Sequence, residues 1–233
     1  MANIMILGDT WGIVPTHTWG FNKKEVVEWF EYQFLKRGHP TFNKSWGGTS
    51  NNHELNQTEA FLAATKDTAM FPDLIIWFHT ELVRDFISPE TDQFGKIGYD
   101  AVLDITAERM YNWVTGIRNE YPSVKWAILG GHAPLHEPKK HMLDWAEFRI
   151  DNLRQEIAGQ FVPHSQAFEF LERGKGSLWD WPAISDEIIQ RELAFKEQIL
   201  AATQDTSKFY NQKHPAVGPM KELANKIIAH FDL

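Results

Sequence analysis

The sequence has 233 residues, of which 43% are hydrophobic, and carries a formal net charge of −8 at pH 7. This size fits one domain, which we place at residues 1–233, with enough apolar residues for a single core. The acidic balance argues against broad nucleic-acid binding, because phosphate backbones need a basic face. The sequence contains no cysteine, which excludes disulfides, thiolate metal sites and a cysteine nucleophile.

The sequence also argues against a membrane protein. No apolar run approaches the ~20 residues that span a bilayer. The N-terminus lacks a charged region followed by an apolar segment of the signal type. We therefore expect a cytoplasmic protein that does not bind membranes.

The N-terminal half alternates predicted strands and helices. Ile4–Leu7 and Leu74–Phe78 are continuous apolar runs, a pattern typical of strands buried on both faces. Between them the sequence predicts a short strand at Thr41–Asn43 and two helices. The first helix, over 22–38, opens on an Asn-x-x-Glu capping box and closes at glycine; the second covers Glu54–Thr65. The inward face of the first helix should consist of Val26, Phe30 and Phe34.

The C-terminal half continues the alternation. A helix over Asp100–Glu120 is followed by a buried strand at Trp126–Leu129, and further helices are expected near Asp144–Ala158, Asp186–Ala202 and Pro215–His230. The helix over Asp100–Glu120 should turn four residues toward the core: Val102, Ile105, Val114 and Ile117. This order predicts an α/β fold in three layers, with a doubly wound, mostly parallel sheet of the flavodoxin-like type.

The segment 161–209 is the least regular part of the sequence. Glycines and a Leu-Trp-Asp-Trp-Pro motif interrupt its helical patterns. Two interpretations fit this composition: a lid over a ligand site, or an insertion that packs on the sheet.

Candidate functional residues follow the predicted strands. Ligands of open α/β sheets bind beyond the carboxyl ends of the strands, so the loops that start at Gly8, Ser45, His79 and Gly130 should meet in one crevice. The first loop carries Gly8-Asp9-Thr10, and Asn211-Gln212-Lys213-His214-Pro215 precedes the last predicted helix. A hydroxyl on a tight turn facing a histidine is typical of a nucleophile and its base.

These motifs resemble the blocks of the SGNH/GDSL hydrolases, in order and across the whole chain. The resemblance implies an SGNH hydrolase fold, with Thr10 as nucleophile, His214 as base and Asn211 as the residue that orients the histidine. It further implies an oxyanion hole formed by Gly48, in the Asn-Lys-Ser-Trp-Gly-Gly motif, and by Thr80. The style of several segments also resembles small SGNH-like proteins of bacteriophages, which would place this chain in the host cytoplasm.

The sequence departs from the family pattern at three positions. Threonine replaces the nucleophilic serine, and its extra methyl group restricts the hydroxyl. Asparagine replaces the acid beside the histidine, so the imidazolium loses a stabilising charge; in the serine-protease template this change costs roughly ten-thousandfold in turnover. At the third block, Thr80 or Glu81 takes the place of the asparagine of the oxyanion hole.

The remaining candidates are residues for substrate binding. We expect Asp9, Trp11, Trp46, Glu81 and His132 to contact the substrate, although Asp9 also suits a structural role in its turn. Arg84 is a candidate clamp for an anionic group or one half of an ion pair with the neighbouring aspartate.

Three functions stay open at this point. The first is an SGNH-like esterase or acyltransferase that needs no cofactor and acts on an ester of a sugar or small metabolite. The second is a binding or scaffolding protein that kept the fold and lost turnover, with a phage accessory protein as one example. The third is a metal-dependent hydrolase that uses His132, His136 and His141, although two prolines keep these histidines off a regular helix. We predict no metal site.

Overall fold

The computed structural model describes residues 1–9, 11–13, 27–47, 49–80, 85, 99–130, 142–158 and 215–233. Within this part of the chain, five parallel strands form one sheet in the order β2-β1-β3-β4-β5. The strands are β1 (Ile4–Gly8), β2 (Thr41–Asn43), β3 (Leu74–Phe78), β4 (Lys125–Leu129) and β5 (Phe148–Ile150). The predicted α/β fold with a doubly wound parallel sheet is confirmed.

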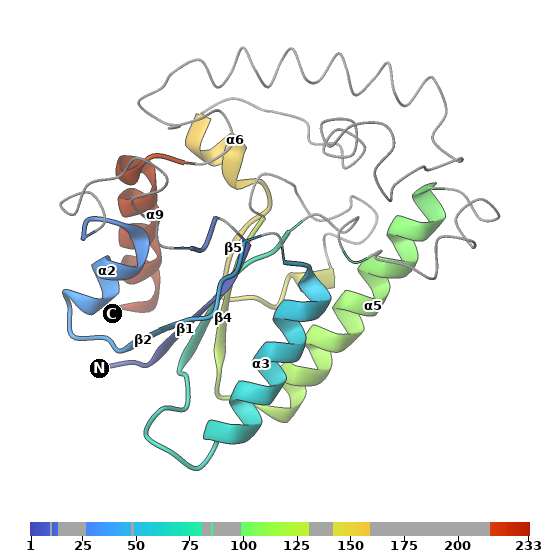
Figure 1. Cartoon of the computed structure of the whole chain (residues 1–233), viewed down its shortest axis with the longest axis horizontal. Coiled ribbons are helices and arrows are strands. Elements are labelled where there is room, and N and C mark those ends of the chain that lie inside the picture. The colour runs from blue at the N-terminus through green and yellow to red at the C-terminus, as the bar shows by residue number, and fades with distance from the viewer. Residues whose placement is uncertain are drawn as a thin grey trace.

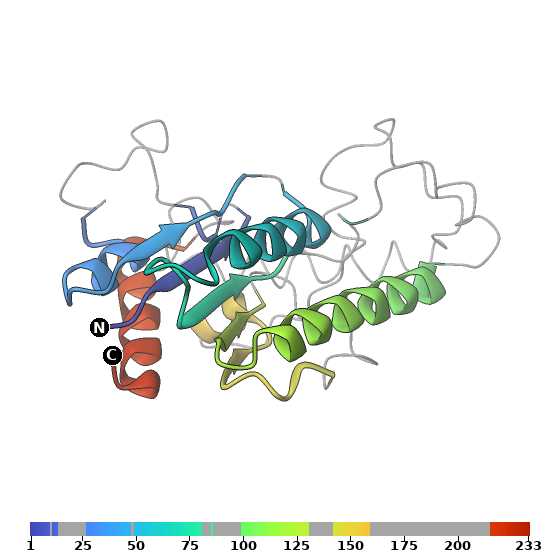
Figure 2. The same cartoon turned by 90° about the horizontal axis from the view of Figure 1, so that it is seen from below.

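Helices cover both faces of this sheet. The helices α2 (Phe30–Leu35) and α9 (Val217–Phe231) lie together on one face. The helices α3 (Asn51–Thr65) and α5 (Tyr99–Glu120) pack side by side on the other (Figures 1 and 2). A short helix, α6 (Leu153–Ala158), follows β5. None of the described helices is long and apolar enough to cross a bilayer.

The central strands are apolar because they face a hydrophobic core on each side. Ile4 and Ile6 of β1 point into the core beneath α2 and α9, whereas Met5 and Leu7 point into the core beneath α3 and α5. All of β1 and β3 is buried. Burial on both faces removes the alternation of polar and apolar residues, which explains the continuous runs in the sequence.

Most predicted elements are confirmed, and four details are wrong. The helix expected from residue 22 begins only at Phe30, after a turn at residues 27–29. The helix expected at Asp144–Ala158 is instead strand β5 followed by the short α6. Ile105, expected to face inward, is 55% exposed on α5. The helix α3 begins three residues earlier than predicted, at Asn51, because Ser50 accepts a hydrogen bond from the His53 amide as its N-cap.

Gly8 lets the carboxyl ends of β1 and β3 approach each other closely. It pairs with Phe78 across the sheet and has a φ of +148°. A Cβ at this position would lie 2.6 Å from Phe78 Cβ and 2.8 Å from the Phe78 carbonyl oxygen. Because one of these atoms belongs to the main chain, no change of rotamer relieves the overlap.

We therefore predict that Gly8→Ala lowers the free energy of unfolding by roughly 3 kcal/mol or more, through its unfavourable φ and this overlap. Gly116→Ala is the matched control, because Gly116 is an exposed residue of α5 whose added Cβ has no neighbour within 4 Å. This control should raise the free energy of unfolding by roughly 0.5–1 kcal/mol. Urea unfolding of both variants is the measurement, and equal effects would contradict the close approach.

Candidate functional site

The strand order locates the expected ligand site. In a sheet of order 2-1-3-4-5, connections leave β1 and β3 toward opposite faces, and a crevice opens beyond their carboxyl ends. The residues that follow these two strands are Asp9, His79 and Thr80, each only 2% exposed. Polar side chains thus gather at the point where the topology favours ligand binding.

Asp9 holds the turn after β1 and joins it to the end of β3. Its Oδ1 accepts a hydrogen bond from the Trp11 amide at 2.9 Å, and its carbonyl oxygen accepts one from the Gly12 amide at 3.1 Å. Its Oδ2 accepts a hydrogen bond from the Thr80 hydroxyl at 3.3 Å. Asp9 therefore fixes the main chain on both sides of residue 10.

Asn51, the first residue of α3, holds the peptide groups of Thr80. Its Oδ1 accepts from the Thr80 amide at 2.9 Å, and its Nδ2 donates to the Thr80 carbonyl oxygen at 3.0 Å. The same carbonyl oxygen lies 3.1 Å from His79 Nδ1. Asn51 is fully buried, so these bonds are shielded from water.

Asp85 supports Asn51 from the other side. Its Oδ2 accepts a hydrogen bond from Asn51 Nδ2 at 2.8 Å, and its Oδ1 accepts one from the Asn52 amide at 2.7 Å. Burial raises the pKa of Asp85 to about 6, although hydrogen bonds from Asn52, Asn51 and Ser50 and the charge of Arg109 favour the ionised form. This carboxyl group therefore titrates nearer to neutral pH than an ordinary aspartate.

The chain after β2 brings an exposed aromatic ring to the same edge. The amide of Trp46 donates to the carbonyl oxygen of Gly8 at 2.9 Å, which extends the pairing of β2 with β1 beyond the strand. The Trp46 side chain is nevertheless 73% exposed. A well-anchored main chain thus presents an indole ring to solvent beside the predicted crevice.

A second, half-buried cluster supports this loop. Asn43 Nδ2 donates to the Gly12 carbonyl oxygen at 2.9 Å and to Glu31 Oε2 at 2.8 Å, while Asn43 Oδ1 accepts from the Ser45 amide at 3.0 Å. Burial raises the pKa of Glu31, which the hydrogen bond from Asn43 partly opposes. A Cβ added at Gly12 would lie 2.3 Å from Ser45 Oγ, so the turns after β1 and β2 are in direct contact.

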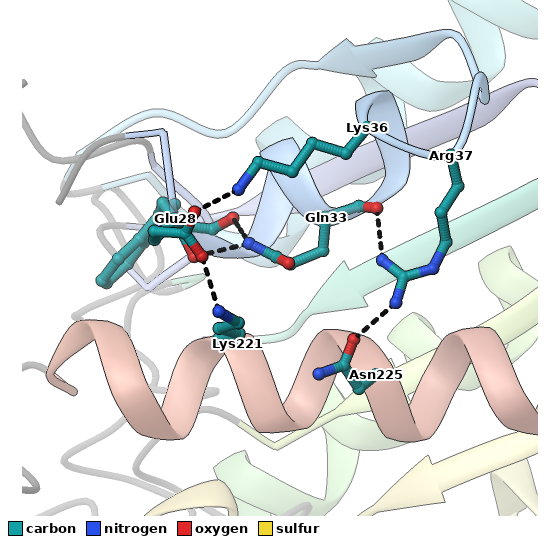
Figure 3. Close-up of polar contacts among 7 residues, drawn as sticks. Glu28, Gln33, Lys36, Arg37, Lys221 and Asn225 are labelled. Atoms are coloured by element: carbon teal, nitrogen blue, oxygen red, sulfur yellow. Dashed lines mark hydrogen bonds and ion pairs between the residues drawn. The ribbon is translucent and has the colours of Figure 1, made fainter. Parts of the chain in front are cut away.

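Polar contacts also fix α9 against α2 (Figure 3). Glu28, just before α2, lies between the ammonium groups of Lys36 and Lys221. Arg37 donates to the Gln33 carbonyl oxygen at 2.8 Å and to Asn225 Oδ1 at 3.1 Å. The two lysines hold the pKa of Glu28 at about 2. These contacts tie the middle of α9 to the residues on either side of α2.

The predicted site residues fall into three groups. Asp9 and Thr80 come together at the switch point, and Trp46 lies exposed at the same edge. Trp11 is 1% exposed and packs in the core beneath α2 and α9, so any contact with a substrate would require that core to open. Six predicted residues lie outside the described part of the chain: Thr10, Gly48, Glu81, His132, Asn211 and His214.

Other predictions also fall outside the described residues. They concern Arg84, the histidines at 136 and 141, the predicted helix at 186–202 and the segment 161–209. Among the residues that the structure does describe, no three histidine, aspartate or glutamate side chains form a group that could hold a metal ion.

Two polar residues of the site escaped the sequence analysis. Asn51 had no role assigned, and Asp85 appeared only as a partner for Arg84. The available signal was weak: Asn51 directly follows the N-cap Ser50, and Asp85 lies seven residues after the end of β3. Their contact joins positions 34 residues apart, which no local pattern in the sequence reveals.

Comparisons with known proteins bear on the fold. No protein-family model matches the sequence, and no curated protein matches it. Among solved structures, the chain is similar to the psychrotrophic esterase EstA from a Pseudoalteromonas species, with 10% identity and a TM-score of 0.52. The match covers 100% of this chain and 97% of EstA.

Two further solved structures have lower TM-scores. They are the lipase Lip_vut3 from a goat rumen metagenome and AlinE4, an SGNH-hydrolase family esterase. Both are 12% identical, with TM-scores of 0.44 and 0.40, and the matches cover 99% and 88% of this chain and 97% of each structure. The likeness to EstA shows the fold alone: the chain has an SGNH-hydrolase-like fold.

The raised pKa of Asp85 should make the free energy of unfolding depend on pH. The folded protein holds this proton more tightly than the unfolded chain does, so the proton stabilises the fold at low pH and this stabilisation is lost as pH rises through about 6. Between pH 4 and pH 7, Asp85 should lower the free energy of unfolding by on the order of 2 kcal/mol.

The measurement is urea unfolding of the wild type and Asp85→Asn across this pH range. The variant should lack this part of the pH dependence. Asp67→Asn, at an exposed carboxylate after α3, is the control and should keep it. A wild type and an Asp85→Asn variant with parallel pH profiles would contradict the buried titration.

Proposed function

We propose that this protein is an SGNH-type ester hydrolase or acyltransferase with Thr10 as its hydroxyl nucleophile. The observation that carries the proposal is the turn formed by Gly8 and Asp9, at the β1/β3 switch point of an SGNH-hydrolase-like fold. Thr10 follows Asp9 in the sequence, and His214 lies three residues before Val217, the first residue of α9. The esterase activity of EstA, which has a similar fold, supports the same chemistry.

The proposed reaction has two halves. In the first, Thr10 Oγ attacks the ester carbonyl carbon and its proton passes to His214. The tetrahedral intermediate then expels the alcohol, which takes the proton from His214 and leaves an acyl group on Thr10. In the second half, water or an acceptor alcohol loses its proton to His214 and attacks this acyl group. The bond from the acyl carbon to Thr10 Oγ then breaks, the acid or the new ester leaves, and His214 returns the proton to Thr10 Oγ.

The supporting groups have separate roles. Asn211 would hold the imidazole tautomer through its amide oxygen, without the charge that an aspartate supplies. The main-chain amides of Thr10 and Gly48 would stabilise the oxyanion. The Thr80 hydroxyl donates to Asp9, so it joins the oxyanion hole only if it leaves that bond. Because one such donor is worth about 3 kcal/mol of transition-state stabilisation, we expect slow turnover.

The exposed Trp46 supports a small or glycan ester as the substrate. An indole face offers an apolar surface on which a sugar ring or a small acyl group packs. Asp9 is buried and Trp11 belongs to the core, so Trp46 is the one described candidate whose ring is accessible. Glu81 and His132 remain proposed contacts of the same substrate.

The second candidate function is a binding protein without turnover. The donation of the Thr80 hydroxyl to Asp9 favours it, because the polar groups at the switch point then serve the fold rather than a reaction. The accessible Trp46 would bind a ligand in either case.

Hydrolysis of p-nitrophenyl acetate by the wild type, Thr10→Ala, Thr10→Ser and His214→Ala separates these functions. We expect the two alanine variants to lose at least roughly a hundredfold in kcat/KM, because they remove the nucleophile or the base. Thr10→Ser should be faster than the wild type, since serine lacks the restricting methyl group.

Two controls sharpen this experiment. Thr58→Ala removes a buried hydroxyl that bonds only within α3 and should keep the wild-type rate. A reactive phosphonate ester should add mass to the peptide that contains Thr10 in the wild type and not in Thr10→Ala. Equal rates in all variants and no labelling would reject the enzyme and favour the binding protein.

A further inference from the structure

We propose that Asn51 is a positioning residue of the candidate site: its side chain, held by Asp85, fixes the Thr80 peptide at the carboxyl end of β3. The proposed function gives neither Asn51 nor Asp85 a role. The effect of Asn51 on turnover rests on that function, whereas its effect on the position of Thr80 does not.

The first step of the argument is that Asn51 replaces a strand partner for Thr80. An asparagine side chain carries two N–H donors and one carbonyl acceptor. The acceptor receives the Thr80 amide, one donor reaches the Thr80 carbonyl oxygen, and the other reaches Asp85. Each of its polar groups is used, and the side chain has no exposed surface.

The second step is that Asp85 fixes the orientation of Asn51. One carboxylate oxygen accepts from Asn51 Nδ2 and the other accepts from the Asn52 amide, so Asp85 binds the side chain and the main chain at the start of α3. Ser50 also donates to this carboxyl group, and Arg109 of α5 attracts it. The side-chain amide of Asn51 therefore has one favourable orientation, in which its oxygen faces the Thr80 N–H and its nitrogen lies between the Thr80 carbonyl oxygen and Asp85.

The third step links Asn51 to the turn after β1. Thr80 receives both peptide contacts from Asn51 and donates its own hydroxyl to Asp9, which in turn holds the Trp11 amide. A continuous chain of hydrogen bonds thus runs from α3 to the main chain beside residue 10. Asn51 touches no reacting group in the proposed mechanism, yet it sets the geometry of the turn that carries the nucleophile.

The experiment measures amide hydrogen exchange at Thr80 by NMR, relative to Ile76 in the middle of β3. In Asn51→Ala the relative exchange rate of Thr80 should rise at least roughly tenfold, because the amide loses its acceptor while β3 stays paired. Thr58→Ala is the matched control: Thr58 is a fully buried polar residue of the same helix and bonds to the Glu54 carbonyl oxygen. This control should leave the relative rate unchanged.

Exchanging the amide and the carboxylate between positions 51 and 85 tests the orientation of the Asn51 side chain. N51D alone removes both donors and places a second carboxylate beside Asp85. Repulsion between the two carboxylates should turn the side chain at position 51 away from Thr80, so Thr80 should exchange faster than in the wild type. In N51D/D85N, the amide at position 85 donates to the carboxylate at position 51, which still accepts from the Thr80 amide. The double variant should therefore exchange more slowly at Thr80 than N51D, although the Thr80 carbonyl oxygen loses its donor in both variants. Should N51A not fold, N51D against N51D/D85N carries the same test.

Turnover gives a separate readout. If hydrolysis depends on Thr10, N51A should lower kcat by roughly tenfold or more with KM nearly unchanged, because positioning acts on the transition state. Thr58→Ala should change neither constant. A merely structural role would instead lower the amount of folded enzyme and leave the kcat of that fraction unchanged.

The outcomes are distinguishable. Unchanged exchange at Thr80 in N51A, or equal acceleration in Thr58→Ala, overturns the positioning role whatever Thr10→Ala shows. Accelerated exchange with turnover that does not depend on Thr10 overturns the proposed function and supports the positioning of Thr80. Accelerated exchange together with an unchanged kcat in a Thr10-dependent enzyme overturns the effect of Asn51 on catalysis.

Discussion

The close approach of β1 and β3 at Gly8 and Phe78 is the constraint on which the rest of the site depends. The space that a Cβ would fill at Gly8 is occupied by the Cβ and the carbonyl oxygen of Phe78 in β3. Both strands therefore end at the same level, and the residues that follow them, Asp9 and Thr80, come within hydrogen-bond distance. The carbonyl oxygen of Gly8 also receives the Trp46 amide, so three loops meet around one glycine.

Hydrogen bonds between side chains and main chain order the polar groups at this edge. Asn51, Asn43 and Asp9 each hold the main chain of a different segment. Such bonds are directional, and inside a protein they are shielded from water, so each buried group strongly favours one arrangement. The ion pairs of Glu28 with Lys36 and Lys221 lie at the surface, where solvent screens them, and they serve mainly to orient α9.

The sequence alone predicts the sheet well because its central strands are buried on both faces, which leaves an unmistakable apolar run. Prediction from the sequence fails where the burial of a residue depends on which other helices and strands pack against it. Ile105 fits the apolar periodicity of α5 yet faces solvent, and β5 is too short and too exposed for its residues, Phe148–Ile150, to form such a run. The contact of Asn51 with Asp85 joins the start of α3 to the chain after β3, which only the folded sheet brings together, so no spacing in the sequence could reveal it.

The same geometry bears on both proposed functions. A threonine at position 80 has a single hydroxyl hydrogen, and Asp9 accepts it. The hydrogen bond from the Thr80 hydroxyl to Asp9 would therefore compete with the proposed stabilisation of an oxyanion by Thr80. An asparagine at that position would have two N–H donors, one for each purpose. With threonine, an enzyme must rely on main-chain amides for its oxyanion hole, while a binding protein loses nothing. Both proposed functions, the hydrolase and the binding protein, fit an ordered carboxyl edge of the sheet at which Thr80 has no second donor for an oxyanion. Only the dependence of turnover on Thr10 separates the two functions.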